Sequence, residues 1–284
     1  MLFDPEDLSD PAVLIALGGW ADAANASCDA LRQLVSVYEA QEIGAIDDER
    51  YWDYQQTRPQ IRESADGPWI EWPSVRLHVV HHPERDLVVM VGPEPSLLWR
   101  SFAREVVERI RTFSPSMVVI LGAMLSDTPH SRALPVGMYS NNPGLRENTV
   151  GVENLDYTGP TGVLGVVAHL LDQVPIPTAQ VWVSVPHYVS SPPNPKAQLA
   201  LTSGIEELLG LTLDRGDLEK DSERWVAAVD ELASADPDVA EYIQQLVEVR
   251  EQEEVEEATG DKIAAEFERY LRRRRDGRGG NHAL

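Results

Sequence analysis

The segment "AQVWVSVPHYVSSPPNPKAQLALTSGIEELLGL" (residues 179–211) contains the structural unit that is repeated through most of the chain. It begins with a short apolar run, "AQVWVSV", which is typical of a strand buried on both faces. It ends with "KAQLALTSGIEELLGL", in which apolar side chains recur at helical spacing. The loop between them contains His187, Tyr188 and four prolines. The segment therefore predicts a strand, a loop that prolines restrict, and a helix.

The same order of strand and helix recurs upstream. Apolar runs at 12–20, 86–95 and 116–125 end at Gly, Pro or a polar loop, and helical patterns cover 21–40, 96–113 and 161–174. A short strand is expected at 42–47, an aromatic and charged loop at 50–62, and edge strands or a hairpin within 68–83. Strands that alternate with helices predict an α/β fold with a mostly parallel sheet between two helix layers. The segments "VLIALGG", "LVVMVG", "MVVILGA" and "VWVSV" are expected to be its inner strands.

Composition limits the class of protein. The chain has 284 residues, of which 43% are hydrophobic, enough for one large domain with extensions. Its apolar runs are too short to span a bilayer, and no signal peptide is recognisable at the N-terminus. Cys28 is the single cysteine, and its apolar neighbours favour a core thiol over a nucleophile. These features predict a cytoplasmic protein.

Charge narrows the choice of partners. The formal net charge of −23 argues against a nucleic acid or an anionic membrane as the main partner. From Asp214 onward, apolar residues at helical spacing lie among many charges, with breaks near Pro237 and Gly260. We therefore expect a core domain at 1–213, a helical extension at 214–275 and a disordered tail at 276–284. The acidic block at 248–257 and the basic block at 269–278 are expected to be solvated helix faces.

Four polar loops follow the predicted inner strands. In open α/β sheets, ligands bind beyond the carboxyl ends of the strands, so these loops are expected to share one edge. They provide acids, bases and hydrogen-bond donors suited to hydrolysis or group transfer, although no pair has a diagnostic local spacing. The candidate residues are Trp20, Asp22, Glu94, His130, Arg132, His187, Tyr188, Asn194 and Lys196.

Each candidate also has a structural interpretation. His187 and His130 could act as general bases or could bond neighbouring backbone groups. Glu94 is expected to cap the helix that begins near Ser96. In "YTGPTG" (157–162), Tyr157, Gly159 and Gly162 precede a helix N-terminus that could hold an anion, but the segment lacks the lysine of a Walker loop, so a plain turn and cap is favoured.

Metal binding is not expected. The adjacent histidines His81 and His82 would point to opposite faces of a strand, which argues against a shared ion. An ATP-dependent ligase would need a nucleotide-phosphate site, but the chain has three lysines (Lys196, Lys220 and Lys262) and no glycine-rich phosphate loop. We therefore expect neither a metal nor another cofactor.

As a set, five motifs resemble the proteasome assembly chaperone family in its actinobacterial branch. They are "GGWADAANA", "VGPEPSLLW", "TPHSR", "YTGPTGVLG" and "SVPHYVSSPPNPKA", and the resemblance covers roughly residues 10–213. It implies an α/β/α fold similar to purine nucleoside phosphorylases, frequent oligomerisation, and eukaryotic relatives that are non-enzymatic chaperones of proteasome α-subunits. No catalytic role comes with the motif positions, which are Trp20, Asp22, Gly92, Glu94, Pro95, His130, Arg132, Gly159, Pro160, Gly162, Pro186, His187, Tyr188, Pro193, Asn194 and Pro195. Ala24 stands where the family usually has a glycine.

Two functional classes follow. One is a protein-binding or assembly-chaperone-like protein, which the resemblance and the helical extension favour. The other is a phosphorylase- or hydrolase-type enzyme that acts on a nucleoside-like or other small molecule at the strand ends. A homo-oligomer is expected, a trimer by resemblance, in which exposed aromatic residues such as Trp52 and Tyr54 are covered. The loop at 186–198 is expected to be a shaping element in which Tyr188 packs and Asn194 caps the helix that starts at Pro195.

Overall fold

The computed structural model describes residues 3–65, 67–149, 151–155 and 157–252. They form two compact units that divide between Val229 and Asp230. In the second unit, a helix covers residues 237–252 and begins at a proline, as the predicted break near Pro237 requires. The predicted break near Gly260, the basic block at 269–278 and the tail at 276–284 lie outside the described residues. The predicted boundary at 213/214 falls in the loop that follows α5 and stays a prediction.

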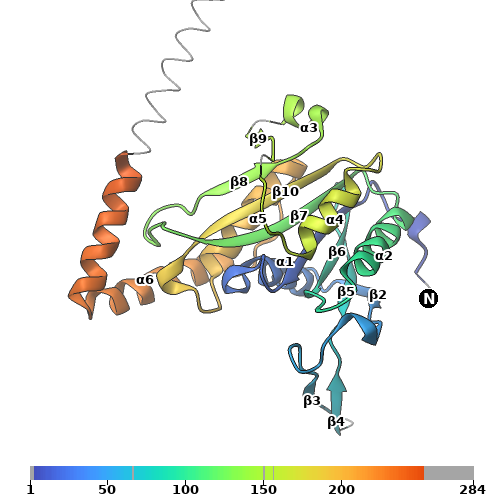
Figure 1. The fold of residues 1–284 in the computed structure, drawn as a ribbon, viewed down its shortest axis with the longest axis horizontal. Coiled ribbons are helices and arrows are strands. Elements are labelled where there is room, and N and C mark those ends of the chain that lie inside the picture. The colour runs from blue at the N-terminus through green and yellow to red at the C-terminus, as the bar shows by residue number, and fades with distance from the viewer. Residues whose placement is uncertain (1–2, 66, 150, 156, 253–284) are drawn as a thin grey trace, which may run out of the picture. The chain divides into compact units, whose positions relative to one another are not determined.

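The first unit is built on a sheet of eight strands in the order β2-β5-β6-β1-β7-β10-β8-β9 (Figure 1). The strands are β1 (Ala12–Gly18), β2 (Gln41–Ile46), β5 (Val75–His81), β6 (Asp86–Pro93), β7 (Met117–Ser126), β8 (Val136–Tyr139), β9 (Val152–Glu153) and β10 (Thr178–Pro186). The four central strands, β6, β1, β7 and β10, run parallel. β5 and β8 flank them in the antiparallel direction. The predicted set of inner strands is therefore confirmed.

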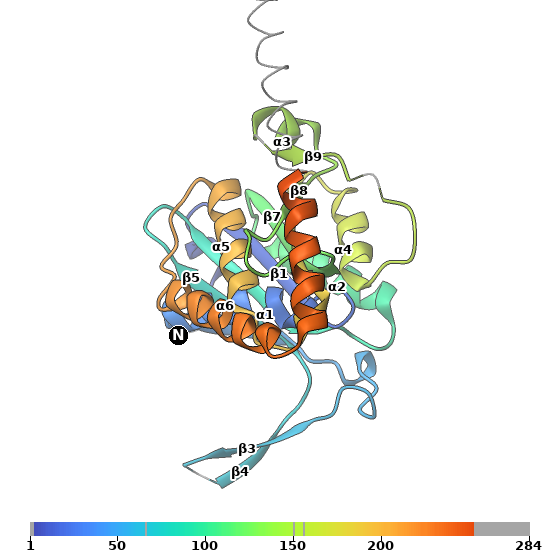
Figure 2. The ribbon, with the colours of Figure 1, turned by 90° about the vertical axis from the view of Figure 1, so that its left-hand side faces the viewer.

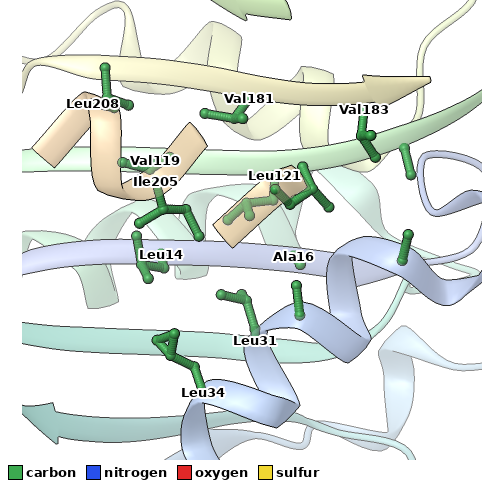
Figure 3. Packing of buried hydrophobic residues seen from close by; sticks show 14 of the residues in the cluster. Leu14, Ala16, Leu31, Leu34, Val119, Leu121, Val181, Val183, Ile205 and Leu208 are labelled. Carbon is green, nitrogen blue, oxygen red and sulfur yellow. The ribbon is translucent and has the colours of Figure 1, made fainter. Parts of the chain in front are cut away.

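The central strands are interior because they are apolar on both faces. Alternate residues of one strand enter two different clusters: Leu14 belongs to the cluster under one pair of helices, and Ile15 belongs to the other. Leu14 is in register with Val89 on one side and Val119 on the other. Figure 3 shows Leu14 and Val119 among the buried side chains of the first cluster.

Helices cover both faces of the sheet, as predicted. α1 (Ala26–Val37) and α5 (Pro195–Leu209) pack on one face, and α2 (Trp99–Thr112) and α4 (Val163–Leu171) on the other (Figure 2). Leu31 and Ile205 project from the first pair into the cluster of Figure 3, and Phe102 is fully buried beneath the second pair. The short α3 (Pro143–Asn148) precedes β9, and α6 (Leu218–Ser234) follows α5. No helix in the described part of the chain is long and apolar enough to cross a membrane.

A separate hairpin, β3 (Gln60–Ser64) and β4 (Gly67–Glu71), stands away from the sheet in both views (Figures 1 and 2). Trp52 lies in the segment that leads to this hairpin. It was expected to be exposed, but the structure buries it. Trp52 is 3% exposed and packs edge-on against Phe102, with ring centroids 6.4 Å apart. Tyr54 is half-buried and packs against Trp72 at 4.9 Å. The expectation that Trp52 is exposed is wrong, because its burial depends on contact with Phe102 of α2, which lies far along the chain.

Candidate functional site

Glu94, directly after β6, connects its own loop to the loop after β1 and to the turn before α4. Its Oε1 accepts a hydrogen bond from the backbone N–H of Val163 at 2.7 Å, and its Oε2 lies 3.4 Å from the backbone N of Trp20. Val163 is the first residue of α4, so Glu94 caps that helix. The prediction that Glu94 caps the helix near Ser96 is wrong. That helix, α2, begins at Trp99, and its N-cap residue, Leu98, makes no side-chain cap hydrogen bond.

Two glycines leave the space that Glu94 occupies. A Cβ on Gly19 would lie 2.8 Å from Oε2 of Glu94, and a Cβ on Gly162 would lie 2.9 Å from Oε1. Gly19 also has a φ of +120°, which other residues rarely adopt. The turn "YTGPTG" therefore leads into a helix N-terminus that the carboxylate of Glu94 caps, in the place where an external anion could otherwise bind. Tyr157 in this turn donates its hydroxyl to the carbonyl of Pro160 at 2.8 Å, across Gly159.

Asp22 lies after β1 and is 4% exposed. Its Oδ1 accepts hydrogen bonds from the N–H and the hydroxyl of Ser27, both at 2.7 Å, which holds the start of α1. Its other oxygen, Oδ2, is buried and has no hydrogen-bond partner among the described residues. Burial, and then the neighbouring charge of Asp22, raise the pKa of the Cys28 thiol. A thiol with a raised pKa is a poor nucleophile, in agreement with the core position expected for Cys28.

A second set of contacts joins the loops after β7 and β10. His130 is 1% exposed, and its backbone N–H and ring Nδ1 each lie 2.8 Å from the hydroxyl of Tyr188. Lys196 donates from Nζ to the carbonyl oxygen of His130 at 2.5 Å. The packing of Tyr188 is therefore confirmed, and His130 bonds a neighbouring group. Arg132 lies half-buried in the same loop.

The remaining candidates in the loop at 186–198 have distinct positions. His187 is partly exposed, and its Nδ1 lies 3.1 Å from a carboxylate oxygen of Asp127. Asn194 is fully buried and accepts a hydrogen bond from the N–H of Ala197 at 3.0 Å, with Pro195 as the first residue of α5. The predicted cap of that helix is confirmed. The catalytic interpretation of His187 remains untested.

A cleft of about 1050 Å³ lies beside the first set of loops, lined by α1, β5 and the segments that lead into and out of the β3–β4 hairpin. Four arginines from separate segments line it: Arg32, Arg58, Arg62 and Arg76. Arg76 bridges Glu42 and Glu71 at 3.0 and 2.9 Å, and Arg62 contacts Glu71 at 2.6 Å. Of the predicted candidates, Asp22 and Glu94 also line this cleft. Sequence reasoning missed the arginines because they are far apart along the chain and form no motif.

Among the residues that the structure describes, no group of His, Cys, Asp and Glu has an arrangement suited to a metal ion. His81 contacts Asp86 at 2.7 Å, and His82 contacts the carbonyl oxygen of Thr212 at 3.0 Å. The two histidines therefore bond different parts of the fold.

The chain matches a known protein family over most of its length. A sequence profile of the PAC2 family matches residues 16–233. The chain belongs to the PAC2 family. A crystal structure of a PAC2 family protein from Streptomyces avermitilis is similar, with 37% identity, a TM-score of 0.75, and 82% of this chain and 99% of that chain covered. A proteasome-assembly chaperone homologue from Mycobacterium tuberculosis is similar to the same extent, with 38% identity, a TM-score of 0.73, and coverage of 82% and 99%.

A more distant structure shares the fold. An archaeal homologue of proteasome-assembly chaperone, PbaA from Pyrococcus furiosus, is 15% identical with a TM-score of 0.59, over 86% of this chain and 96% of that chain. No match was found among curated proteins. The resemblance to the proteasome assembly chaperone family and its actinobacterial relatives is therefore confirmed.

Proposed function

We propose that this PAC2 protein is a non-enzymatic, assembly-chaperone-like protein that binds a protein partner through the carboxyl edge of its sheet. The proposal is supported by its 38% identity to a homologue described as a proteasome-assembly chaperone homologue. The partner itself is not identified by this similarity. The surface that we propose for the partner is the carboxyl edge of the sheet.

The observation that carries the proposal is a set of exposed apolar side chains at that edge. Large apolar groups are normally exposed singly on a soluble surface, and a concentration of them marks an interaction site. Here they follow the parallel strands β1 and β6, lie near the end of the neighbouring parallel strand β7, and precede α4. They are Trp20, Leu97, Leu98, Met124, Leu125 and Tyr157, all between 46% and 65% exposed.

The polar groups of the same edge hold the loops in place. Glu94 caps α4, Asn194 caps α5, and the hydroxyl of Tyr188 bonds His130. The first two contacts each hold a loop to the start of a core helix, and the third joins the loops after β7 and β10 to each other. A rigid edge of this kind loses little conformational entropy when a partner binds, which favours association.

Co-purification from the native host, followed by mass spectrometry, tests the proposal. We expect a stoichiometric protein partner with the wild-type chain and its loss from the double variant Trp20→Ala/Leu98→Ala. Leu232→Ala is the matched control, because Leu232 is 69% exposed but belongs to the second unit. The proposal fails if no stoichiometric partner is found, or if the double variant retains the partner as well as the control does.

We also propose that the chain forms a homo-oligomer, a trimer by resemblance. The β3–β4 hairpin and the residue after it expose Ile61, Trp69, Ile70 and Trp72, which are 45% to 78% exposed and suited to contact between subunits. Light scattering at micromolar concentration tests this. A monomer would contradict it.

The enzyme alternative has its own test. The purified chain is incubated with nucleosides and phosphate, and separately with ATP, carboxylates and amines. We expect no turnover in either mixture. Turnover that disappears in His187→Ala while the melting temperature stays unchanged would favour an enzyme, with His187 and Asp127 in contact at 3.1 Å as its acid–base pair.

A further inference from the structure

The solvent-facing side of α2 continues the apolar edge that we propose for the protein partner. Leu97 and Leu98, which are 49% and 51% exposed, directly precede this helix. Arg100 and Arg104 follow in its first and second turns, and both are exposed. Residues four apart lie on one face of a helix. The two apolar side chains are therefore followed by two cations that share one face.

These two arginines have no carboxylate beside them. Neither forms an ion pair with any residue that the structure describes, and Nε of Arg104 donates to the carbonyl oxygen of Arg100 at 3.0 Å. At the other end of the same helix face, Arg111 contacts Glu108 at 3.2 Å. The chain has 47 acidic residues against 24 Lys and Arg, so carboxylates that could serve as partners are plentiful. The unpaired cations are thus a local property of the end of α2 next to the apolar edge.

The stability of α2 does not explain this arrangement. Like charges four residues apart repel each other and destabilise a helix. A cation in the first turn also opposes the helix dipole, which favours an anion at the N-terminus, and the first turn of α2 contains no acidic residue. Departures from the locally stable choice are expected at functional sites. The two arginines are therefore candidates for binding.

On the basis of the proposed function, we propose that Arg100 and Arg104 bind carboxylates of the protein partner, which presents an acidic patch beside the part that contacts the apolar edge. Guanidinium groups bind carboxylates through paired, charge-assisted hydrogen bonds, and apolar neighbours that exclude water strengthen them. The net charge of −23 repels an acidic partner at long range, but salt screens this repulsion beyond roughly 8 Å, so that the local pairs decide at contact. The same net charge opposes a nucleic acid as the occupant.

The variant Arg100→Glu separates binding from folding. It replaces a like-charge pair by a carboxylate that precedes Arg104 by four residues, which is the favourable order, and it puts an acid in the first turn. The melting temperature of the isolated chain should therefore stay the same or rise. The introduced carboxylate also engages Arg104, so both arginines are withdrawn from the partner. We expect binding of the partner to weaken by about 10- to 100-fold.

Arg111→Glu is the matched control. It makes the same change of charge on the same helix face, at a position about 16 Å along the helix axis from Arg100. It breaks the contact with Glu108 and puts an anion at the helix C-terminus, so the melting temperature should fall. Binding of the partner should be unchanged, because this end of α2 lies away from the apolar edge.

The probe is the protein that co-purifies with the wild-type chain, itself purified and titrated calorimetrically into the full chain and both variants at low and at physiological ionic strength. We expect Arg100→Glu to weaken binding selectively and to reduce its dependence on salt. Equal affinities of Arg100→Glu and Arg111→Glu, a lowered melting temperature of Arg100→Glu, or release of the partner by nuclease would overturn the acidic patch. Loss of binding in Trp20→Ala/Leu98→Ala would still uphold the proposed function in those cases. If no partner co-purifies, both proposals fail together.

Discussion

Glu94 and Val163 are 69 residues apart in the sequence, and a hydrogen bond of 2.7 Å joins the carboxylate of one to the backbone N–H of the other. This contact ties the end of β6 to the start of α4. It also fills the position at which a helix N-terminus would otherwise attract an external anion. The glycine-containing turn before α4 is therefore part of the structural frame of the edge.

Removing that carboxylate should destabilise the fold. We expect Glu94→Ala to lower the free energy of unfolding by about 0.5 to 2 kcal/mol, the usual effect of losing a helix cap, and Glu94→Gln to lower it less because the amide oxygen can still accept. Urea denaturation gives the measurement. Glu84→Ala is the control, since Glu84 is exposed and its carboxylate is not a cap. Equal stability of Glu94→Ala and the control would show that the contact contributes nothing.

Gly19 should tolerate substitution less well than another glycine of positive φ. Gly19→Ala places a Cβ 2.8 Å from Glu94 at a φ of +120°, and we expect a loss of about 2 kcal/mol or more. Gly210 ends α5 with a φ of +67° and open space around its Cβ position, so Gly210→Ala should cost only about 1 kcal/mol. Comparison of the two urea midpoints shows how much the contact with Glu94, together with the less favourable φ of Gly19, adds to the ordinary cost of a left-handed alanine. The reverse order would contradict the tight approach of Glu94 to this turn.

Ala24 adopts a left-handed conformation, with a φ of +53° and a ψ of +25°. By the resemblance described above, the family usually has glycine at this position. A Cβ in this region destabilises the folded state by roughly 1 to 2 kcal/mol. Glycine removes this strain but makes the unfolded chain more flexible, which lowers the free energy of unfolding by a smaller amount, about 0.4 to 1 kcal/mol. We therefore expect Ala24→Gly to leave stability unchanged or to raise it by up to about 1 kcal/mol, as measured by thermal unfolding. A clear loss would show that the buried methyl group matters more than the strain.

Much of the fold could be predicted because its signals are local. The runs that became β1, β6, β7 and β10 are apolar on both faces, and Asn194 lies directly before the helix that it caps. The β3–β4 hairpin was not predicted in full, since every residue of β3 is exposed and no burial pattern marks it. Segment 50–62 was consequently assigned to a loop.

The site could be predicted only in part, for a different reason. Loop positions follow from the parallel sheet, so Trp20, Asp22 and Glu94 were correctly expected at one edge. The partner of Glu94 and the group of four arginines depend on contacts between distant segments. A single sequence contains no spacing that reveals such contacts.

Stability at high pH should depend on Tyr51. Burial, together with a hydrogen bond of 2.6 Å from its hydroxyl to Glu105, raises the pKa of Tyr51 from 10.0 to about 12. The folded state then holds the phenol proton more tightly than the unfolded state. The resulting stabilisation is complete below pH 10 and is lost as the pH rises from 10 towards 12.

The variant Tyr51→Phe lacks this ionisation. Its free energy of unfolding should therefore fall less steeply than that of the wild type between pH 10 and pH 12, by about 1 to 2 kcal/mol over the interval. Tyr157→Phe, at a residue that is 60% exposed, is the control. Parallel curves for the wild type and Tyr51→Phe would refute the assigned shift.

The loop that follows β10 should act through the cap at its end. Asn194 is fully buried, and its side-chain oxygen accepts from the N–H of Ala197 at the start of a helix that packs on the main sheet. Loss of such a cap typically costs about 1 kcal/mol, so Asn194→Ala should lower the free energy of unfolding by that amount. The matched control is Asn142→Ala, which removes a similar cap from α3, a helix of six residues with no buried side chain. Because α3 adds little to the core, the control should have a smaller effect in urea denaturation. If the two variants lose equal stability, the cap that Asn194 provides for α5 contributes no more than a cap on a peripheral helix. The proposed shaping role of residues 186–198 would then lose its main support.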